Sequence, residues 1–198
     1  MVKARFWRLL VRLLIRAVQI PRVLIYSLLS NSQFHGRPSC HQPVQAVGTG
    51  IIKFGTEVGT GCFPSPLFSS TYAYIEARQP TATVSISNGT WINNNFPAIA
   101  EHTSINIWEN CRIGTSVEII DSDFHGVKVS GRGLSKPEWE KTVSVGDYVF
   151  IGSNVKILKG VTIGNGVVIS NGSIVTKDFP SDVVIGGNPA TVLNVIRQ

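Results

Sequence analysis

The chain has 198 residues, of which 43% are hydrophobic and only 15% are charged. This is enough apolar material for the core of one domain and argues against extended disorder. The net charge of +6 is uneven, because seven of the eighteen basic residues lie in the first 37 positions and no acidic residue precedes Glu57. The rest of the chain is nearly neutral, which argues against a nucleic-acid-binding body. Three cysteines without framework spacing exclude a disulfide scaffold and fit a reducing compartment.

Residues 1–30 predict a basic amphipathic helix, which Pro21 is expected to end or kink. An arginine in nearly every turn argues against a transmembrane span, and no cleavable signal peptide is indicated. Two alternatives remain. Either the helix contacts the cytoplasmic face of a membrane, or its apolar face packs on the body of the protein or on a neighbouring subunit. The polar side chains recur every three or four residues and so share one face: Arg5, Arg8, Arg12, Arg16 and Gln19.

From residue 145 onward the sequence repeats every six residues. Positions 145, 151, 157, 163, 169 and 175 are Val or Ile, and positions 149, 155, 161 and 167 are all Val. A strict period of six suits a coil whose short strands are joined by tight turns and stack as parallel rungs about 4.8 Å apart. Cys111 falls on the fifth position of a hexad, so we expect it in the core. The same register extends upstream, in hexads that begin at Ile86, Ile92, Ile107, Ile113 and Ile119.

We therefore expect an all-β domain over residues 44–198, although residues 61–80 contain strand-like pieces without a clear place. The repeat stops between Gly126 and Thr142, in a polar segment that contains no hexads. A loop of this length inside a regular coil is usually functional or contacts a partner. His125 is the last residue before this predicted loop.

The stretch IGSNVKILKGVTIGNGVVISNGSIVTKDFPSDVVIGGNPA, with the upstream motifs WINNNF and SDFH, resembles the hexapeptide-repeat acyltransferases. It is most similar to the maltose and galactoside O-acetyltransferases and to their relatives in surface-polysaccharide clusters. The resemblance implies a left-handed parallel β-helix, a homotrimer, and acetyl-CoA bound in a groove between adjacent β-helices. No metal is expected, because His35, Cys40 and His41 match no standard ligand spacing.

The resemblance also implies roles for individual residues. His125 is the expected general base, because a histidine titrates close to working pH and can take the proton of an attacking hydroxyl. Asn93 matches an active-site asparagine, although Asn94 and Asn95 are alternatives. Glu101 occupies the position of an acid that holds the acceptor hydroxyl, and we place Asp123 with it on the substrate side.

The surroundings of the imidazole remain open on the sequence alone. Asp121 or Asp123 is a candidate to orient the ring, and a solvated corner carboxylate is the alternative. His102 is expected at the acceptor cleft or simply exposed. Phe150 stands where many relatives carry Trp, and no arginine follows the terminal NPA closely. For acetyl-CoA the resemblance implies Ser153, Asn171, Thr176 and Lys177.

The expected function is transfer of an acetyl group from acetyl-CoA to a hydroxyl of a sugar or surface polysaccharide, directly and without an acyl-enzyme. The alternatives are an N-acyltransferase acting on an amino sugar, free or nucleotide-linked, and a non-catalytic β-helix scaffold. We expect a cytoplasmic protein that contacts the inner membrane face through residues 1–30. The motifs do not define the acceptor, the position acylated or the length of the acyl group.

Overall fold

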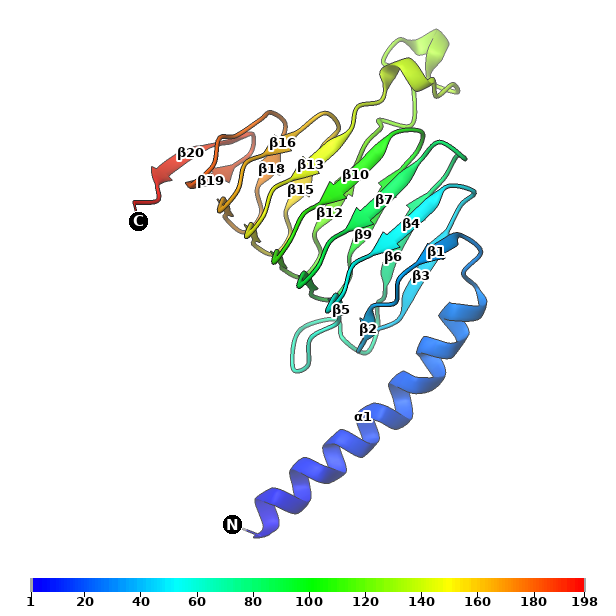
Figure 1. Ribbon diagram of the computed structural model, residues 1–198, viewed down its shortest axis with the longest axis vertical. Helices are drawn as coiled ribbons and strands as arrows, with labels where there is room; N and C mark the ends of the chain where they lie inside the picture. The colour runs from blue at the N-terminus through cyan, green and yellow to red at the C-terminus, as the bar shows by residue number, and fades with distance from the viewer. Residues whose placement is uncertain (1, 198) are drawn as a thin grey trace.

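The computed structural model describes residues 2–197 and shows a parallel β-helix preceded by one long helix (Figure 1). Three short strands make one coil, and each of them belongs to a different sheet. The first sheet contains β1 (Gln33–His35), β4 (Ile51–Phe54), β7 (Thr83–Ile86), β10 (Ser104–Ile107), β13 (Val143–Val145) and β16 (Thr162–Ile163). The second sheet contains β2 (Ser39–Cys40), β5 (Gly59–Thr60), β8 (Trp91–Ile92), β11 (Arg112–Ile113), β14 (Phe150–Ile151), β17 (Val168–Ile169), β19 (Val183–Gly187) and β20 (Ala190–Val195). The third sheet contains β3 (Val44–Val47), β6 (Ala73–Ala77), β9 (Pro97–Ala100), β12 (Glu118–Ile120), β15 (Lys156–Ile157) and β18 (Ile174–Val175).

The period of six arises because each hexad supplies one strand and one corner. The first residue of each hexad points inward, where it meets the same position of the coils above and below. One column of the core therefore runs through the second sheet, and its members are at most 3% exposed: Ile92, Ile113, Ile151, Ile169 and Ile185. Burying each of these side chains contributes about 1.5–3 kcal/mol.

Asparagine and aspartate occupy the corners because their side chains join successive coils. Asn171 Oδ1 accepts the Ser153 N–H at 2.7 Å, and Asn165 Oδ1 accepts the Asp147 N–H at 2.9 Å. A corner N–H points away from the strand ladders, so without these acceptors it would depend on water. The Asn-rich composition of the repeat is thus largely structural.

The β-helix begins earlier than expected, since β1 starts at Gln33 and completes a first coil with β2 and β3 before residue 51. The segment 61–80 is now placed. Residues 61–72 form a loop between β5 and β6, and β6 continues the third sheet from Ala73. At the other end of the stack, β19 pairs with β17 and adds β20 as an antiparallel partner.

The helix α1 (Val2–Leu28) continues through Pro21, so the expectation that the helix ends there is wrong. Pro21 lacks the N–H for one backbone bond of the helix, but side chains on both sides of it attach the helix to the body. Gln19 Nε2 donates to Phe68 O at 3.2 Å, and Arg22 Nη2 donates to Thr71 O at 2.6 Å. Both partners lie in the 61–72 loop, which thereby holds α1 against the β-helix.

The apolar face of α1 points away from the body of the same chain. Leu13 is 63% exposed and Leu28 is 86% exposed, whereas Gln19 on the opposite face is buried. The alternative in which the apolar face packs on this chain's own body is therefore wrong, while a membrane or a neighbouring subunit remains possible. The side chains of Arg5 and Arg8 lie outside the described ones. Among the described residues, no helix combines the length and hydropathy needed to cross a bilayer.

Candidate active site

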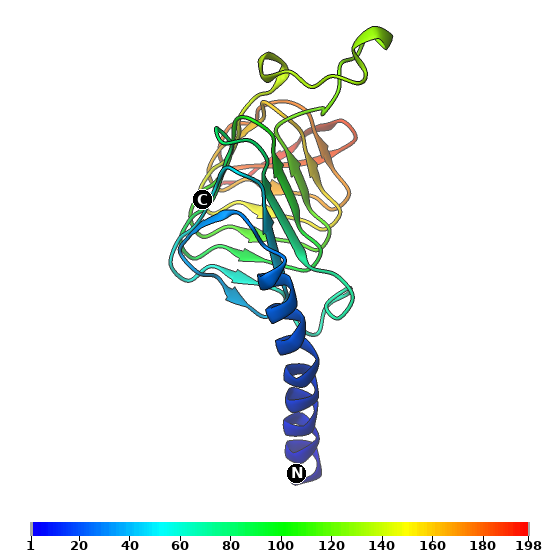
Figure 2. The same ribbon diagram turned by 90° about the vertical axis from the view of Figure 1, so that its right-hand side faces the viewer.

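The segment between β12 and β13, here called the His125 loop (residues 121–142), projects away from the β-helix (Figures 1 and 2). It carries two short 3₁₀ helices, η1 (Val129–Gly131) and η2 (Pro137–Trp139). The loop was expected to begin at residue 126, but the last strand before it ends at Ile120. His125 therefore lies within the loop and not at its edge.

Asp121 is the first residue of the His125 loop, and its carboxylate accepts backbone N–H groups at the corner of the coil. The side chain is fully buried and accepts the Glu101 N–H at 2.7 Å and the Thr103 N–H at 3.0 Å. These contacts join the loop to the preceding coil. Asp121 is thus a corner acceptor, and the structure gives it no contact with the imidazole of His125.

His125 is exposed and lines a hollow of about 670 Å³ together with Lys128, Lys136, Trp139 and Lys159. Its Nδ1 lies 3.1 Å from the carbonyl oxygen of Gly126. Because a carbonyl only accepts, this contact requires a proton on Nδ1 and leaves the lone pair on Nε2. With the ring neutral, this assignment gives the tautomer that a general base needs.

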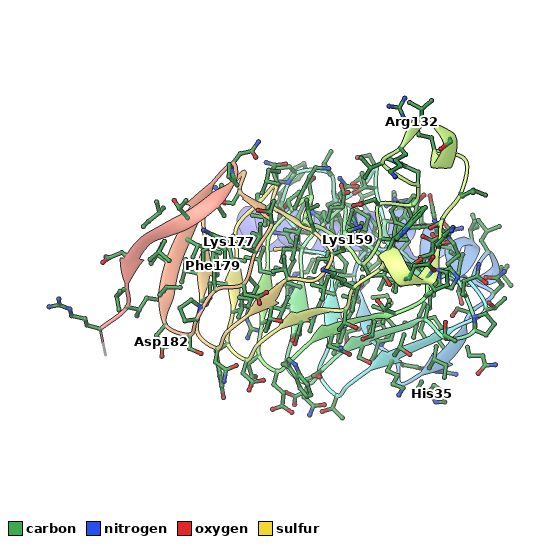
Figure 3. The ribbon with its side chains drawn as sticks, turned by 90° about the horizontal axis from the view of Figure 1, so that it is seen from above. His35, Arg132, Lys159, Lys177, Phe179 and Asp182 are labelled. Carbon is green, nitrogen blue, oxygen red and sulfur yellow. The ribbon has the colours of Figure 1, made fainter. Side chains whose placement is uncertain are left out.

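Asp123 does not orient that imidazole. Its carboxylate forms an ion pair with Lys159 Nζ, which also donates to Trp139 O at 2.8 Å. Lys159 lies at the base of the His125 loop, whereas Arg132 lies at its tip (Figure 3). Asp123 thus ties the beginning of the loop to its end, and its expected contact with substrate finds no support in this geometry.

Glu101 is also engaged within the protein. Its Oε2 accepts hydrogen bonds from Ser122 Oγ at 2.6 Å and Ser135 Oγ at 2.7 Å, and its Oε1 faces Arg78 Nη1 at 3.3 Å. Burial disfavours the charge, but the two serine hydroxyls and Arg78 outweigh it, so the pKa of Glu101 lies below its ordinary value. This geometry argues against the expected contact of Glu101 with the acceptor hydroxyl.

Two of the three partners of Glu101, Ser122 and Arg78, contact Phe124, the residue that precedes His125. The Phe124 N–H donates to Ser122 Oγ at 2.9 Å, and the Arg78 guanidinium lies 4.8 Å from the centre of the Phe124 ring. Phe124 has φ +60°, a conformation that costs a non-glycine residue energy unless its neighbours hold it. Glu101 therefore positions the backbone from which the His125 side chain projects.

The end of the His125 loop is held by a pair that the sequence did not indicate. His102 Nδ1 lies 2.7 Å from Glu140 Oε1, and the Glu140 side chain is 0% exposed. Burial raises the pKa of Glu140, and the hydrogen bond to His102 only partly offsets this. The second oxygen, Oε2, has no protein partner among the described residues. His102, expected at the acceptor cleft or exposed, instead anchors the loop.

Ligand atoms of Glu101, His102 and Glu140 lie within 4.8 Å of one another. Such a group can hold a cation, but Arg78 already neutralises Glu101, and both serines occupy its other oxygen. The arrangement is therefore that of a loop anchor, and we assign no metal to it.

The three consecutive asparagines have different roles. Asn94 is fully buried, where its Oδ1 accepts the Cys62 N–H at 3.0 Å and its Nδ2 donates to Pro66 O at 2.8 Å. It therefore fixes the 61–72 loop. Asn95 Nδ2 donates to Ser116 Oγ at 2.9 Å, which joins two coils. Asn93 accepts from the Asn94 N–H, and its Nδ2 has no hydrogen-bond partner in the described part of the protein. Of the three, Asn93 is the one whose Nδ2 makes no hydrogen bond to the described residues.

The expected site residues fall at two different corners of the β-helix. The corner between the second and third sheets carries Asn93, Ser153 and Asn171, and the corner between the third and first sheets carries His125, Thr176 and Lys177. A strand of the third sheet such as β9 has four residues, so the two corners are about 13 Å apart or more. One chain does not bring the two groups together.

The residues expected to contact acetyl-CoA are otherwise exposed or part of corners. Ser153 Oγ accepts the Thr115 N–H at 3.2 Å, and Asn171 holds the Ser153 N–H. Thr176 and Lys177 are exposed, and Lys177 Nζ lies 5.7 Å from the centre of the Phe179 ring (Figure 3). Lys177 is free to meet an anionic ligand, whereas Asn171 has a structural role that the sequence did not separate from a binding one.

Known proteins match both the sequence and the fold. Residues 142–177 match the family described as bacterial transferase hexapeptide (six repeats). A polysialic acid O-acetyltransferase from Escherichia coli O1:K1 / APEC is 38% identical over 110 residues, which cover 56% of this chain. The matched segment spans 36% of the length of that relative.

Two solved structures have the same architecture. A hexapeptide-repeat acetyltransferase from Vibrio cholerae O1 biovar eltor, complexed with acetyl coenzyme A, is 25% identical, with a TM-score of 0.50 over 90% of this chain and 78% of that one. A galactoside acetyltransferase in complex with coenzyme A is 27% identical, with a TM-score of 0.51 over 73% of this chain and 66% of that one. The expected left-handed parallel β-helix and the resemblance to hexapeptide-repeat acyltransferases are confirmed.

Proposed function

Because the chain has the repeat and the β-helix of hexapeptide-repeat acetyltransferases, we propose that it transfers an acetyl group from acetyl-CoA to a sugar hydroxyl of a surface glycan. The observation that carries this proposal is the imidazole of His125. It projects into the hollow of the His125 loop with Nδ1 bonded to Gly126 O and with Nε2 free. The similarity to a polysialic acid O-acetyltransferase supports a glycan acceptor.

The chemistry follows from this tautomer. Nε2 of His125 takes the proton of the acceptor hydroxyl as its oxygen attacks the thioester carbonyl. A C–O bond forms and the C–S bond breaks, and the imidazolium then returns the proton to the departing CoA thiolate. Cys111 is an unsuitable nucleophile, because it is buried as expected and burial raises its pKa to about 11. The acetyl group is therefore transferred directly from CoA to the acceptor, and His125 alone moves the proton.

The complete site requires two chains in this proposal. Asn93 and Ser153 lie at one corner and His125 and Lys177 at another, so a groove between adjacent β-helices of a homotrimer would bring the two sets together. Coexpression of His125→Ala with Asn93→Ala chains tests this arrangement. About a quarter of the interfaces in mixed trimers would then contain both native residues, so activity returns to about that fraction. If each variant is inactive and the mixture stays inactive, the two-chain site is wrong.

The function itself is tested by incubating glycan and activated-sugar acceptors with acetyl-CoA and measuring free thiol. His125→Ala is expected to abolish release, whereas His35→Ala on β1 replaces an exposed histidine remote from the site and leaves release intact. Paired acceptors that differ only in a hydroxyl or an amine separate O-transfer from N-transfer. If His125→Ala keeps near-normal transfer, the assigned base is wrong. If no acceptor releases thiol above hydrolysis, the non-catalytic scaffold is favoured.

We also propose that α1 holds the protein at the cytoplasmic face of a membrane, where a lipid-linked or polymer-bound glycan would be within reach. The exposed leucines of its outer face support this proposal. Replacing Leu13 and Leu24 by Gln reduces the apolar area of this face of α1 and leaves its charge unchanged. Loss of vesicle flotation in this variant is the expected result, and unchanged flotation contradicts the proposal.

A further inference from the structure

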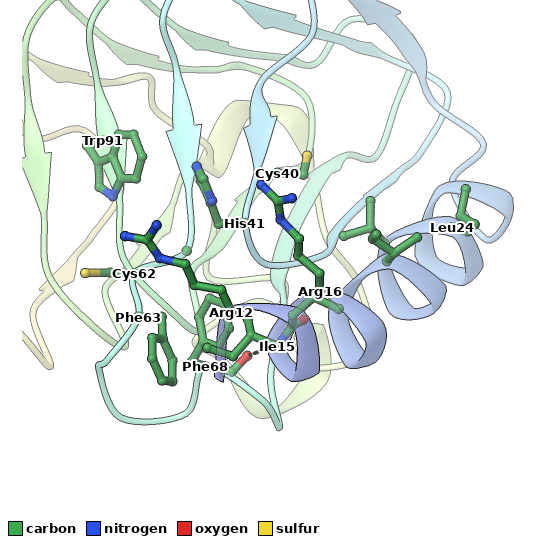
Figure 4. Close-up of a pocket in the computed structure, with 14 residues that line it drawn as sticks. Arg12, Ile15, Arg16, Leu24, Cys40, His41, Cys62, Phe63, Phe68 and Trp91 are labelled. Carbon is green, nitrogen blue, oxygen red and sulfur yellow. Dashed lines mark hydrogen bonds between the residues drawn. The ribbon is translucent and has the colours of Figure 1, made fainter. Parts of the chain in front are cut away.

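A second large hollow, of about 760 Å³, lies between α1 and the second sheet, far from the His125 loop. We call it the helix groove. It is lined by Arg12, Arg16 and Gln19 of α1 and by His41, Phe63 and Trp91 of the β-helix (Figure 4). The polar face of α1 thus borders an open groove on the surface of the β-helix.

The charge in the helix groove is unbalanced. Arg12 and Arg16 are exposed, and the salt bridges of the described part of the chain include neither of them. No acidic side chain is among the residues that line the groove. Arg22, one turn further on, is different, because its guanidinium is occupied by the carbonyl oxygens of Phe68 and Thr71.

The two guanidinium groups, which take part in no ion pair among the described residues, both line the helix groove and lie on either side of His41 (Figure 4). Figure 4 shows Arg12 extended toward Trp91 and Cys62 and Arg16 extended toward His41 and Cys40. Both point across the groove, over an aromatic surface in which the His41 and Trp91 rings are 5.5 Å apart. Two guanidinium forks above one cavity are suited to a phosphate group, whose oxygens accept their paired N–H donors.

The groove is also continuous with the apolar face of α1. Ile20 is 56% exposed and Leu24 is 60% exposed, and both line the groove while belonging to the same exposed surface as Leu13 and Leu14. A soluble anion would use only the arginines and leave this surface in water. An amphiphile with an anionic head and an apolar tail would use both at once.

We propose that the helix groove binds the phosphate headgroup of an anionic membrane phospholipid, with Arg12 and Arg16 as its ligands and the acyl chains along the apolar face of α1. This inference rests on the membrane contact proposed above, and it adds that the contact selects for anionic lipid. Trp91 also lines the groove, and tryptophan favours the boundary between headgroups and acyl chains.

The test measures binding of the full chain to vesicles of phosphatidylcholine, with and without 30% phosphatidylglycerol, by sedimentation at about 0.1 M salt. The Arg12→Gln/Arg16→Gln variant is expected to bind the anionic vesicles roughly 30-fold more weakly, since each basic residue at such a surface contributes a factor of about 5. Arg37→Gln/Lys53→Gln removes the same charge from residues outside the groove and is expected to lose only about 3-fold, because salt screens more distant charges.

The possible outcomes distinguish this inference from the proposals on which it depends. If both variants lose the same binding to anionic vesicles, the attraction is unspecific and the lipid site in the helix groove is wrong. If the protein binds both kinds of vesicle equally, the lipid site is also wrong, but the membrane contact stands. No binding to any vesicle overturns both. Binding of the soluble anions inorganic phosphate and oligosialic acid is followed by isothermal titration calorimetry, with the Arg12→Gln/Arg16→Gln variant as the comparison. If oligosialic acid binds through the two arginines and anionic vesicles do not, the groove belongs to an acidic glycan and the lipid assignment is wrong. Thiol release with soluble acceptors is measured separately and does not depend on the groove.

Discussion

Replacing Glu101 by Gln should loosen the His125 loop without unfolding the β-helix. Gln keeps the volume of Glu101 and one acceptor oxygen, but it loses the charge that joins Ser122, Ser135 and Arg78. The loop lies outside the coils, so it can open while the core column stays packed. Ser122 and Arg78 both hold Phe124, and the change therefore reaches the backbone beside His125.

The size of the effect follows from the contacts. A hydrogen bond to a charged acceptor contributes about 1 kcal/mol more than one to a neutral acceptor, and Glu101 accepts two such bonds from serines. Arg78 adds at most about 1 kcal/mol, because it is partly exposed. The sum of about 2–3 kcal/mol raises the opening constant of the loop by a factor between about 30 and about 160. A displacement of about 1 Å at His125 would lower kcat up to 100-fold.

Hydrogen exchange of peptides from residues 122–136, together with kcat and KM for acetyl-CoA, measures both effects. Faster exchange and a lower kcat at unchanged KM are expected for Glu101→Gln. The matched control is Glu118→Gln on β12, which breaks an exposed pair with Lys156 and should change stability by less than about 0.5 kcal/mol. If exchange in the loop is unchanged, or if Glu118→Gln has the same effect, Glu101 does not position His125.

Two further substitutions and one labelling experiment test other parts of the structure. His102→Ala leaves the buried carboxylate of Glu140 without its partner, so thermal denaturation should show a loss of about 3–5 kcal/mol at pH 8. The loss of stability should be smaller at pH 5. Burial raises the pKa of Glu140, so its protonated carboxyl favours the folded state, and this contribution is lost as pH rises through the folded-state pKa. An equal loss of stability at pH 5 and pH 8 would contradict this account. Asn94→Ala removes the buried amide that holds the 61–72 loop and should cost about 2–4 kcal/mol in urea denaturation, whereas a change below 1 kcal/mol would mean that the loop is held elsewhere. Cys111 should resist iodoacetamide at pH 8 until the protein unfolds, because its thiol is buried with a pKa of about 11, and rapid labelling of the native protein would refute its place in the core.

The sequence by itself determined the coil, because the information for a hexad is local. An Ile or Val at every sixth position must point inward in any arrangement that buries it, and the same positions then stack from Ile92 to Ile185. The interruption near His125 was visible for the same reason, since a stretch without inward-pointing residues cannot continue the coil. Pro21 shows the limit of such local rules, because contacts from the distant 61–72 loop support the helix on both sides of it.

Only the tertiary structure decided what the polar residues do. A carboxylate at a corner looks the same in the sequence whether it meets a substrate, a serine hydroxyl or a lysine, and that choice depends on which coil lies above it and where the loop returns. Glu101 and Asp123 form hydrogen bonds or ion pairs with such partners, whereas Asn93 and His125 keep free polar atoms at separate corners. The direction of Arg12 and Arg16 is likewise not local, because a helix of any given pattern can present either face to its neighbours. It is the attachment of Gln19 and Arg22 to the 61–72 loop that directs Arg12 and Arg16 to the helix groove.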